Sequence, residues 1–387
     1  MSTKAKGLAA ARADISKSLR ALDVVTNTKY SGTKVPVPAA GLHDILLALL
    51  ASVKKETTTL ALAFKPPITE GAISQQLDKL TDQVGRLVSC VIAAAGGGGE
   101  ARSLLVDDWN AGVLHLGSEL ERLLTVLEES VGSEPAVPAA SSSKVTDDNP
   151  YLAHTGLVWD AVDRFAASLP PTEVAAVTQH WEGQKETVRD AWSEYKEFLE
   201  DHEEDEEDDE DDDDDEDEAE DGDDGDDDEW GMLEKGLDAK LNPTERKRSE
   251  AVSRRARFRA DMTQAKPLLG LHQIMHAQLP RHLGLLVHEP EEAYTALLDA
   301  SAGVVAAFDT AVSAMYPEQD GAEVAATLDA LGGKSRALAA AFSARLASSP
   351  ADEAKKEIAA SFVRRWLERL DVESLEWETK RLALVEL

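Results

Sequence analysis

The sequence has a single cysteine, few aromatic residues and no long uncharged apolar run, and each shortage excludes a class of protein. With Cys90 alone, the chain can form neither an internal disulfide nor a multi-cysteine metal site. Its apolar surroundings lead us to expect a buried thiol and a reducing compartment. No stretch reaches the ~18 uncharged apolar residues of a membrane span, and Met1 to Gly7 leads into an amphipathic pattern rather than a signal region. We therefore expect a cytoplasmic and nuclear protein without a membrane contact.

Motifs that carry chemistry are also missing. The segment from Gly332 to Ser335 resembles the end of a phosphate-binding loop, but Leu328 stands where that loop needs a further glycine. His272 and His276 have the four-residue spacing of a zinc-binding pair, yet no third ligand accompanies them, so we expect packing or surface histidines. The sequence has no G-x-S-x-G elbow. We interpret the protein as a non-enzyme that needs no cofactor and no metal.

The residues that are abundant favour helices. Ala and Leu supply most apolar positions, and strand-rich runs of Val, Ile, Tyr and Thr are absent. Apolar residues recur at spacings of three, four and seven, which places them on one face of a helix. The pattern predicts helices near residues 8–25, 42–64, 69–96, 101–129, 151–169, 172–199, 291–316, 323–348 and 351–387, and another that starts at Asn242 and is divided or kinked by Pro267 and Pro280.

A run of nearly pure carboxylate interrupts this helical pattern. Residues 200–229 contain 26 acidic side chains and account for most of the net charge of −34; the rest of the chain carries −8. Such a run has nothing apolar to bury and repels itself, so we expect it to be disordered. The remaining mild acidity makes direct nucleic-acid binding unlikely.

A basic segment follows the acidic run. Its cations are Arg246, Lys247, Arg248, Arg254, Arg255, Arg257 and Arg259. Three interpretations stay open: a helix face neutralised by the neighbouring carboxylates, a nuclear-import signal, and a nucleic-acid helix. We favour neutralisation, because an adjacent polyanion competes with phosphate for the same cations.

The chain is long enough for two domains, since a single core usually stops growing at ~250–300 residues. Short connections between long helices favour antiparallel neighbours. We predict an all-α protein with two antiparallel helical bundles, 1–199 and 230–387, joined by a disordered acidic segment, 200–229. The segment from Ser133 to Pro150, rich in Pro, Ser and Ala, is the competing boundary.

Three segments together resemble the cyclin-D-interacting protein family. They are Leu46 to Phe64, with its Lys-Lys-Glu-Thr-Thr-Thr core at 54–59; Thr155 to Asp163, with Leu169-Pro170 after it; and Phe308 to Pro317. The resemblance implies an all-helical, two-part protein of nucleus and cytoplasm. It also implies a protein that binds cyclins or transcriptional regulators and restrains the cell cycle.

Partner binding by such a protein would use the grooves of its bundles. Most tryptophans in these Ala- and Leu-rich helices are expected to be core anchors, and an exposed subset would mark a groove. The candidate partner-binding residues are Trp109, Trp159, Asp160, Asp163, Asp309 and Tyr316. The alternative function is an acidic chaperone or scaffold, in which residues 200–229 hold basic proteins such as histones.

Overall fold

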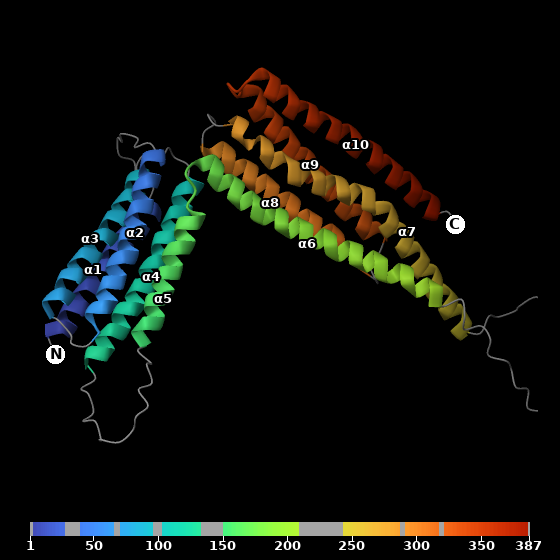
Figure 1. Cartoon of the computed structure of the whole chain (residues 1–387). Helices are drawn as coiled ribbons and strands as arrows, with labels where there is room; N and C mark the ends of the chain where they lie inside the picture. Colours follow the sequence, from blue (N-terminus) through green and yellow to red (C-terminus); the bar gives the residue numbers. More distant parts are fainter. Residues whose placement is uncertain are drawn as a thin grey trace, which may run out of the picture. The chain divides into compact units, whose positions relative to one another are not determined.

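The computed structural model describes residues 3–27, 39–65, 70–95, 103–132, 150–208, 243–286, 291–316 and 321–385. This part of the chain forms ten α-helices and one 3-10 helix, and it contains no strand (Figure 1). The all-α prediction is confirmed. The helices are α1 (Thr3–Asn27), α2 (Ala39–Ala63), α3 (Glu70–Ala95), α4 (Leu104–Gly132), α5 (Pro150–Ser168), α6 (Glu173–Asp208), α7 (Pro243–Gln278), η1 (Leu279–Leu286), α8 (Glu291–Ser313), α9 (Gly321–Ser348) and α10 (Glu353–Val385).

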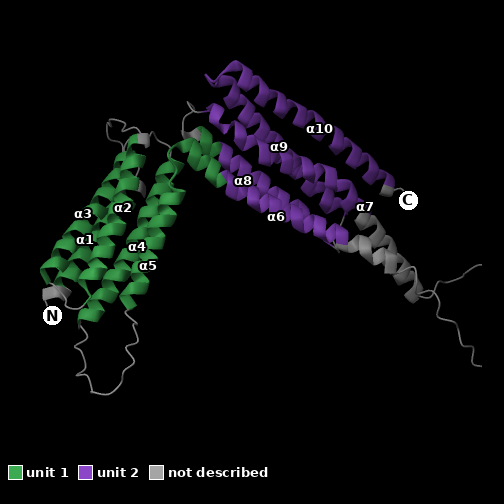
Figure 2. Cartoon of the chain, in the orientation of Figure 1, with its two compact units in different colours: residues 1–180, 289–296 green, residues 181–288, 297–387 purple. Residues whose placement is uncertain are grey.

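The chain divides into two compact units (Figure 2). Unit 1 comprises residues 1–180 and 289–296, and unit 2 comprises residues 181–288 and 297–387. The division falls inside α6, between His180 and Trp181, whereas the sequence pattern placed the boundary at 200–229. Gly183 follows this point by two residues, but α6 continues through both without a break. The competing boundary at 133–150 lies within unit 1.

Unit 1 is built on α1 to α5, which run alongside one another (Figure 1). Lys54 contacts Asp163 and Thr58 contacts Trp159, so residue numbers rise along α2 as they fall along α5. These two helices are therefore antiparallel. The apolar stripes that defined the helices in the sequence converge in one buried cluster, which extends from Leu8 in α1 to Ala176 in α6. Cys90 is only partly buried and packs against this cluster.

The start of α4 is capped by a side chain from α6. The Glu173 carboxylate accepts hydrogen bonds from the backbone N–H groups of Leu104 (2.9 Å) and Leu105 (3.1 Å) and from the Ser103 hydroxyl (2.8 Å). These backbone donors have no partner within their own helix, and a carboxylate there also meets the positive end of the helix dipole. This cap fixes where α4 begins relative to the first turn of α6.

Unit 2 packs the rest of α6 against α7, with α8, α9 and α10 completing the unit. The Trp181 indole N–H donates to the His276 carbonyl (3.1 Å), and the Tyr195 hydroxyl donates to the Met262 carbonyl, so α6 and α7 are antiparallel. From α10, the Trp366 N–H donates to the Leu271 carbonyl at 2.8 Å. Each of these aromatic side chains is buried, and each satisfies its polar atom on the backbone of α7.

Two prolines lie in the helical region that the sequence predicted to be divided or kinked. Helix α7 runs from Pro243 to Gln278 and passes through Pro267 without ending there, and Pro280 lies in η1. Proline removes a single backbone donor from a helix interior, and the buried neighbours Leu268 and Leu269 keep this part of α7 packed in unit 2. Pro267 therefore does not divide the helix, whereas α7 gives way to η1 next to Pro280, as the sequence predicted.

The acidic run also begins differently. Helix α6 continues to Asp208, so residues 200–208, which we had assigned to the disordered segment, are helical. Extending an existing helix costs far less than nucleating one, and Glu is a good helix former. Residues 209–242 and the side chains of 201–259 lie outside the described part of the structure, so of the predicted basic segment from Arg246 to Arg259 only the helical backbone in α7 is described.

In the described part of the chain, one helix segment passes a membrane-span test by length and composition. It is Ala293–Ser313 in α8, one third of which is buried. Core helices of soluble proteins pass the same test, and the segment contains Asp299 and Asp309. The finding is weak support for a membrane span.

Candidate functional site

Two sequence segments that carry the family resemblance meet on unit 1. The first supplies Lys54 and Thr58 from α2, and the second supplies Trp159 and Asp163 from α5. Lys54 Nζ lies 2.6 Å from both carboxylate oxygens of Asp163, and the Trp159 indole N–H donates to Thr58 Oγ1 at 3.1 Å. We call these four residues the α2–α5 edge. About 100 residues of sequence separate the partners of each pair.

Trp159 is the large apolar side chain of this edge, and 37% of it is exposed. Val158 and Val162 lie on the buried face of α5. Trp159 directly follows Val158 and therefore lies at the margin of that face. Two exposed leucines lie on the same side as Trp159. Leu62 is four residues beyond Thr58 on α2 and is 63% exposed, and Leu152 is seven residues before Trp159 on α5 and is 50% exposed. The edge therefore has an apolar end, a tryptophan in the middle and an ion pair at the other end.

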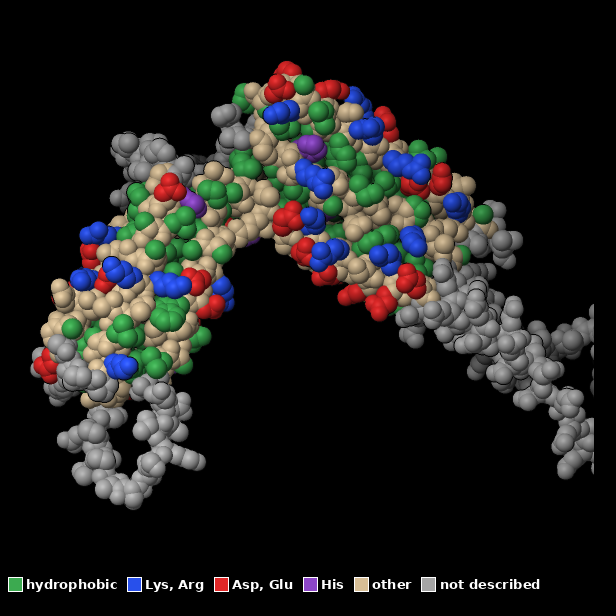
Figure 3. Space-filling view, viewed as in Figure 1, with side chains coloured by type: hydrophobic (Ala, Val, Ile, Leu, Met, Phe, Trp, Pro, Cys, Tyr) green, Lys and Arg blue, Asp and Glu red, His purple; other side chains and the backbone are tan. Residues whose placement is uncertain are grey.

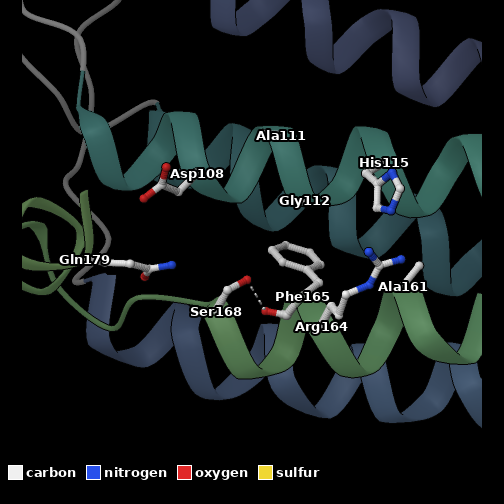
Figure 4. A pocket seen from close by; sticks show the side chains of 9 residues that line it. All are labelled: Asp108, Ala111, Gly112, His115, Ala161, Arg164, Phe165, Ser168 and Gln179. Carbon is white, nitrogen blue, oxygen red and sulfur yellow. Dashed lines mark hydrogen bonds between the residues drawn. The ribbon is translucent and has the colours of Figure 1, made fainter. Parts of the chain in front are cut away.

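The opposite side of α5 borders a cavity of about 240 Å³ (Figure 4). We call it the α4–α5 pocket. Asp108 and Gln179 lie at one end, and His115 and Arg164 lie at the other. Its remaining lining residues are Ala111, Gly112, Ala161, Phe165 and Ser168.

The floor of the pocket depends on a close approach of α4 and α5. A Cβ atom on Gly112 would lie 2.1 Å from Cε2 of the Phe165 ring, well inside van der Waals contact. Figure 4 shows the ring directed at Gly112. Because Phe165 is 6% exposed and held by the core, the ring has little room to move away. Glycine at position 112 is thus what allows the two helices to pack this closely.

One end of the pocket is an acid–base pair. Asp108 Oδ1 lies 2.7 Å from His180 Nε2, while Oδ2 is buried and has no hydrogen-bond partner within the described residues. Burial raises the pKa of the Asp108 carboxyl, and the hydrogen bond and charge of His180 oppose that rise. At the other end, the Arg164 guanidinium is paired with Asp160 at 2.6 Å.

The structure separates the sequence-predicted candidates. Trp159 and Asp163 belong to the α2–α5 edge, whereas Asp160 is paired with Arg164, a lining residue of the pocket. Trp109 is fully buried in α4, and its N–H donates to the Pro170 carbonyl at 3.0 Å. Trp109 is therefore a core residue and cannot contact a partner at the surface.

The other two candidates belong to unit 2. Asp309 is exposed on α8, and Tyr316 is 40% exposed with its ring edge-on to Phe198 at 5.1 Å. Most of the third resemblance segment is core, because Phe308, Val312 and Met315 are buried. His272 and His276 are buried as well and bond to Ser335 and Ser301. No group of three or more metal-capable side chains occurs among the described residues.

Several residues of the site were not among the partner-binding candidates, although Lys54 and Thr58 lie in the resemblance core at 54–59. They are Lys54, Thr58, Asp108, Arg164 and His180. A signal for the α2–α5 edge was present, since Lys54 and Thr58 are four residues apart, as are Trp159 and Asp163, which places each pair on one face of its helix. Asp108 and His180 had no such signal, because they are 72 residues apart and lie on different helices.

The described part of the chain is all-helical, and Figure 3 shows charged groups of both signs and apolar patches on each unit. Residues 45–201 match the family model described as "Grap2 and cyclin-D-interacting, N-terminal". The match confirms the family resemblance over this part of the chain, which includes most of α2 and all of α3, α4 and α5. No curated protein matches the chain.

Proposed function

We propose that this chain is a non-enzymatic, protein-binding regulator of the nucleus and cytoplasm, with D-type cyclins as the first partners to test. The matching family is named for interaction with cyclin D. The observation that carries the proposal is the meeting of two resemblance segments at the α2–α5 edge, where Trp159 is part-exposed. Binding there would regulate the partner by occupying one of its surfaces.

The composition of the α2–α5 edge supports this role. Tryptophan is enriched among the residues that dominate interface energies, because it combines a large apolar surface with one polar atom. Trp159 is already held by its hydrogen bond to Thr58, so little side-chain freedom is lost on binding. Leu62 and Leu152 extend the apolar surface, and an amphipathic helix of the partner would lay its apolar face along them.

Substitution of Trp159 tests the proposal. In the full chain, Trp159→Ala should weaken cyclin D binding about tenfold or more, which is the usual effect of losing a dominant interface residue. Leu157→Ala is the matched control, because Leu157 is 45% exposed on the same helix but points roughly 200° away from Trp159. Affinity is measured by biolayer interferometry, and circular dichroism checks that both variants fold.

A second variant separates the contact from its support. Thr58→Val keeps the indole but removes its hydrogen-bond acceptor, so binding should weaken by only a few-fold. If Trp159→Ala binds cyclin D with unchanged affinity, the α2–α5 edge is not the binding surface. The chaperone alternative predicts instead that histone binding depends on residues 200–229 and is indifferent to Trp159.

A further inference from the structure

A row of side chains beside the α2–α5 edge ends in a lysine on each side. Lys55, Thr58, Leu62 and Lys65 follow one another at spacings of three, four and three residues, which places them on one face of α2. Lys65 comes just after the helix, and its N–H donates to the Leu62 carbonyl at 3.1 Å, so the turn continues to this residue. Both lysines are exposed. The row therefore holds Thr58 and Leu62 between two cations.

These two end lysines differ from the other charged groups nearby. Lys54 is paired with Asp163 between the helices, and Asp160 is paired with Arg164 within α5. Within the described residues, no ion pair engages either end lysine. The charge that remains without a counter-charge at this surface is therefore positive, although the protein as a whole is acidic.

The facing row on α5 offers an open apolar surface. Leu152, Gly156 and Trp159 follow one another at spacings of four and three residues and share one face of the helix. A Cβ atom on Gly156 would meet no other atom within 4 Å. Glycine inside a helix costs about 1 kcal/mol relative to alanine, and no described neighbour requires it here. An outside group therefore has room to approach the backbone beside Trp159.

Charge and spacing together select the occupant. An amphipathic helix of a protein partner can place apolar side chains on Leu62 and Trp159, with carboxylates facing the end lysines. Lys55 and Lys65 are about 15 Å apart along a helix axis, so matching carboxylates lie one on each side of the apolar side chains. Residues 200–229 of this chain do not have this form, because Ala219 is their only apolar residue.

We propose that the segment bound at the α2–α5 edge is an acidic amphipathic helix of the partner, with apolar side chains on Trp159 and carboxylates opposite Lys55 and Lys65. The proposal rests on the function proposed above, in that the edge binds a protein, and it adds the charge and spacing of the bound segment. It predicts that association weakens as ionic strength rises, because salt screens the attraction between exposed charges.

Designed peptides test the charge of the occupant without a natural partner. The probe is a stapled, fluorescein-labelled alanine helix of about 16 residues. It carries two leucines four residues apart and one glutamate a turn outside each leucine. A second peptide has lysine in place of both glutamates. Fluorescence anisotropy with the full chain should give a Kd on the order of 10 µM for the acidic peptide, and binding about tenfold weaker or less for the basic one.

Exchanging the charge assigns the preference to the two lysines. The double variant Lys55→Glu, Lys65→Glu should bind the acidic peptide about tenfold more weakly and the basic peptide more tightly than the parent chain. The matched control is Lys79→Glu, Lys355→Glu, which makes the same charge change at exposed positions on α3 and α10 and should keep the parent preference. Circular dichroism checks that both variants fold. Equal affinity of the parent chain for the two peptides, or no exchange of preference in the first variant, would overturn the proposal.

A segment of the chain itself is the competing occupant. Asp226 to Leu233 combines carboxylates with Trp230, Met232 and Leu233. Replacing these three apolar residues by alanine should leave the affinity of the acidic peptide unchanged. A rise of about tenfold or more would show that this segment fills the edge in place of a partner.

The partner assay separates this inference from the proposed function. The variant Lys55→Glu, Lys65→Glu should weaken cyclin D binding about tenfold. If Trp159→Ala weakens cyclin D binding and the lysine variant does not, the edge binds cyclin D through a segment that is not acidic, and the inference is wrong. If the peptides exchange as expected but neither variant affects cyclin D binding, the edge binds an acidic helix of another protein, and the function proposed above fails instead.

Discussion

The cores of the two units use different means to hold their helices in register. In unit 1, α4 fits against its neighbours by shape: Gly112 admits the Phe165 ring, and a Cβ atom on Gly117 would lie 2.4 Å from Leu19. In unit 2, buried polar side chains join helices in series, from Gln184 on α6 through Ser301 on α8 to His276 on α7. Close contacts of this kind are disturbed by added volume, whereas hydrogen-bonded side chains are disturbed by the loss or protonation of a partner.

This difference has a consequence for how each unit responds to its surroundings. Unit 1 also buries polar atoms that have no hydrogen-bond partner among the described residues; Thr57, Gln76 and Asn110 do not titrate, and the others belong to Asp108, Glu119 and His154. The polar core of unit 2 contains His272 and His276, which can take up a proton. Close packing should therefore make unit 1 sensitive to added volume, and unit 2 sensitive to acid.

The largest expected effect is selective acid unfolding of unit 2. Burial lowers the pKa of His272 to about 3 and that of His276 to about 4, from the usual 6.5. Below pH 6.5 the unfolded chain therefore binds more protons than the folded one, and stability falls with pH until the folded pKa values are reached. The loss is on the order of several kcal/mol. NMR signals of the Trp181 and Trp366 indoles should vanish at a higher pH than that of Trp109.

A matched variant isolates the two histidines. Asn at 272 can imitate the Nδ1 contact to Ser335, and Gln at 276 can imitate the Nε2 contact to Ser301, without titrating. The double variant His272→Asn, His276→Gln should flatten the acid response of unit 2 and leave that of unit 1 unchanged. Loss of both units at one pH in the parent chain would show that the polar core does not set their difference.

Added volume should produce the next largest effect, this time in unit 1. Gly112→Ala places a methyl group against the Phe165 ring, and overpacking of this kind costs about 1–3 kcal/mol. Gly85→Ala is the control, since nothing lies within 4 Å of its Cβ on α3 and alanine favours a helix by about 1 kcal/mol. Urea unfolding should show opposite signs for the two variants. Equal stabilisation by both would mean that the helices can separate without cost.

Apolar spacing was sufficient to predict where helices form, because each stripe repeats at helical period and ends at a breaker. Helix α3 ends at Ala95, before the predicted stop at Gly96, and the chain leaves α5 before Pro170. The same spacing is consistent with an exposed Trp159, because this residue lies beside the apolar stripe that contains Val158 and Val162. The fold class and the outer position of Trp159 therefore follow from local pattern.

The pairings between helices did not follow from it. Ser335 was considered only as the last residue of a rejected phosphate loop, although it is the buried partner of His272, 63 residues away. From the sequence, Gly112 indicates only a residue that weakens a helix. The structure shows that it makes room for the Phe165 ring. Such contacts depend on which helices become neighbours and on their relative shift. The pocket, the polar core and the cap by Glu173 belong to that class.

Removing a surface ion pair should have the smallest effect on the stability of either unit. Lys54–Asp163 and Arg336–Asp371 each join two helices, in units 1 and 2 respectively, and all four side chains are more than one third exposed. Lys54→Met and Arg336→Met keep the stems, and each should change stability at pH 7 by less than about 1 kcal/mol. Urea unfolding measures both. A cost of several kcal/mol in either unit would contradict the assignment of the difference to the cores.

Acid should then separate these two variants. Burial is the main cause of the low pKa of His272, and the positive charge of Arg336 lowers it further. Removing that charge raises the folded pKa towards 6.5, so the folded and unfolded states differ less in bound protons. Arg336→Met should hold unit 2 folded to a slightly lower pH, as read from the Trp366 signal, while Lys54→Met leaves the acid response of unit 1 unchanged. Arg336 and His272 line the same cavity, but nearly half of the Arg336 side chain faces solvent, which screens its charge. If the acid midpoint of unit 2 is the same in Arg336→Met as in the parent chain, burial alone lowers the pKa of His272.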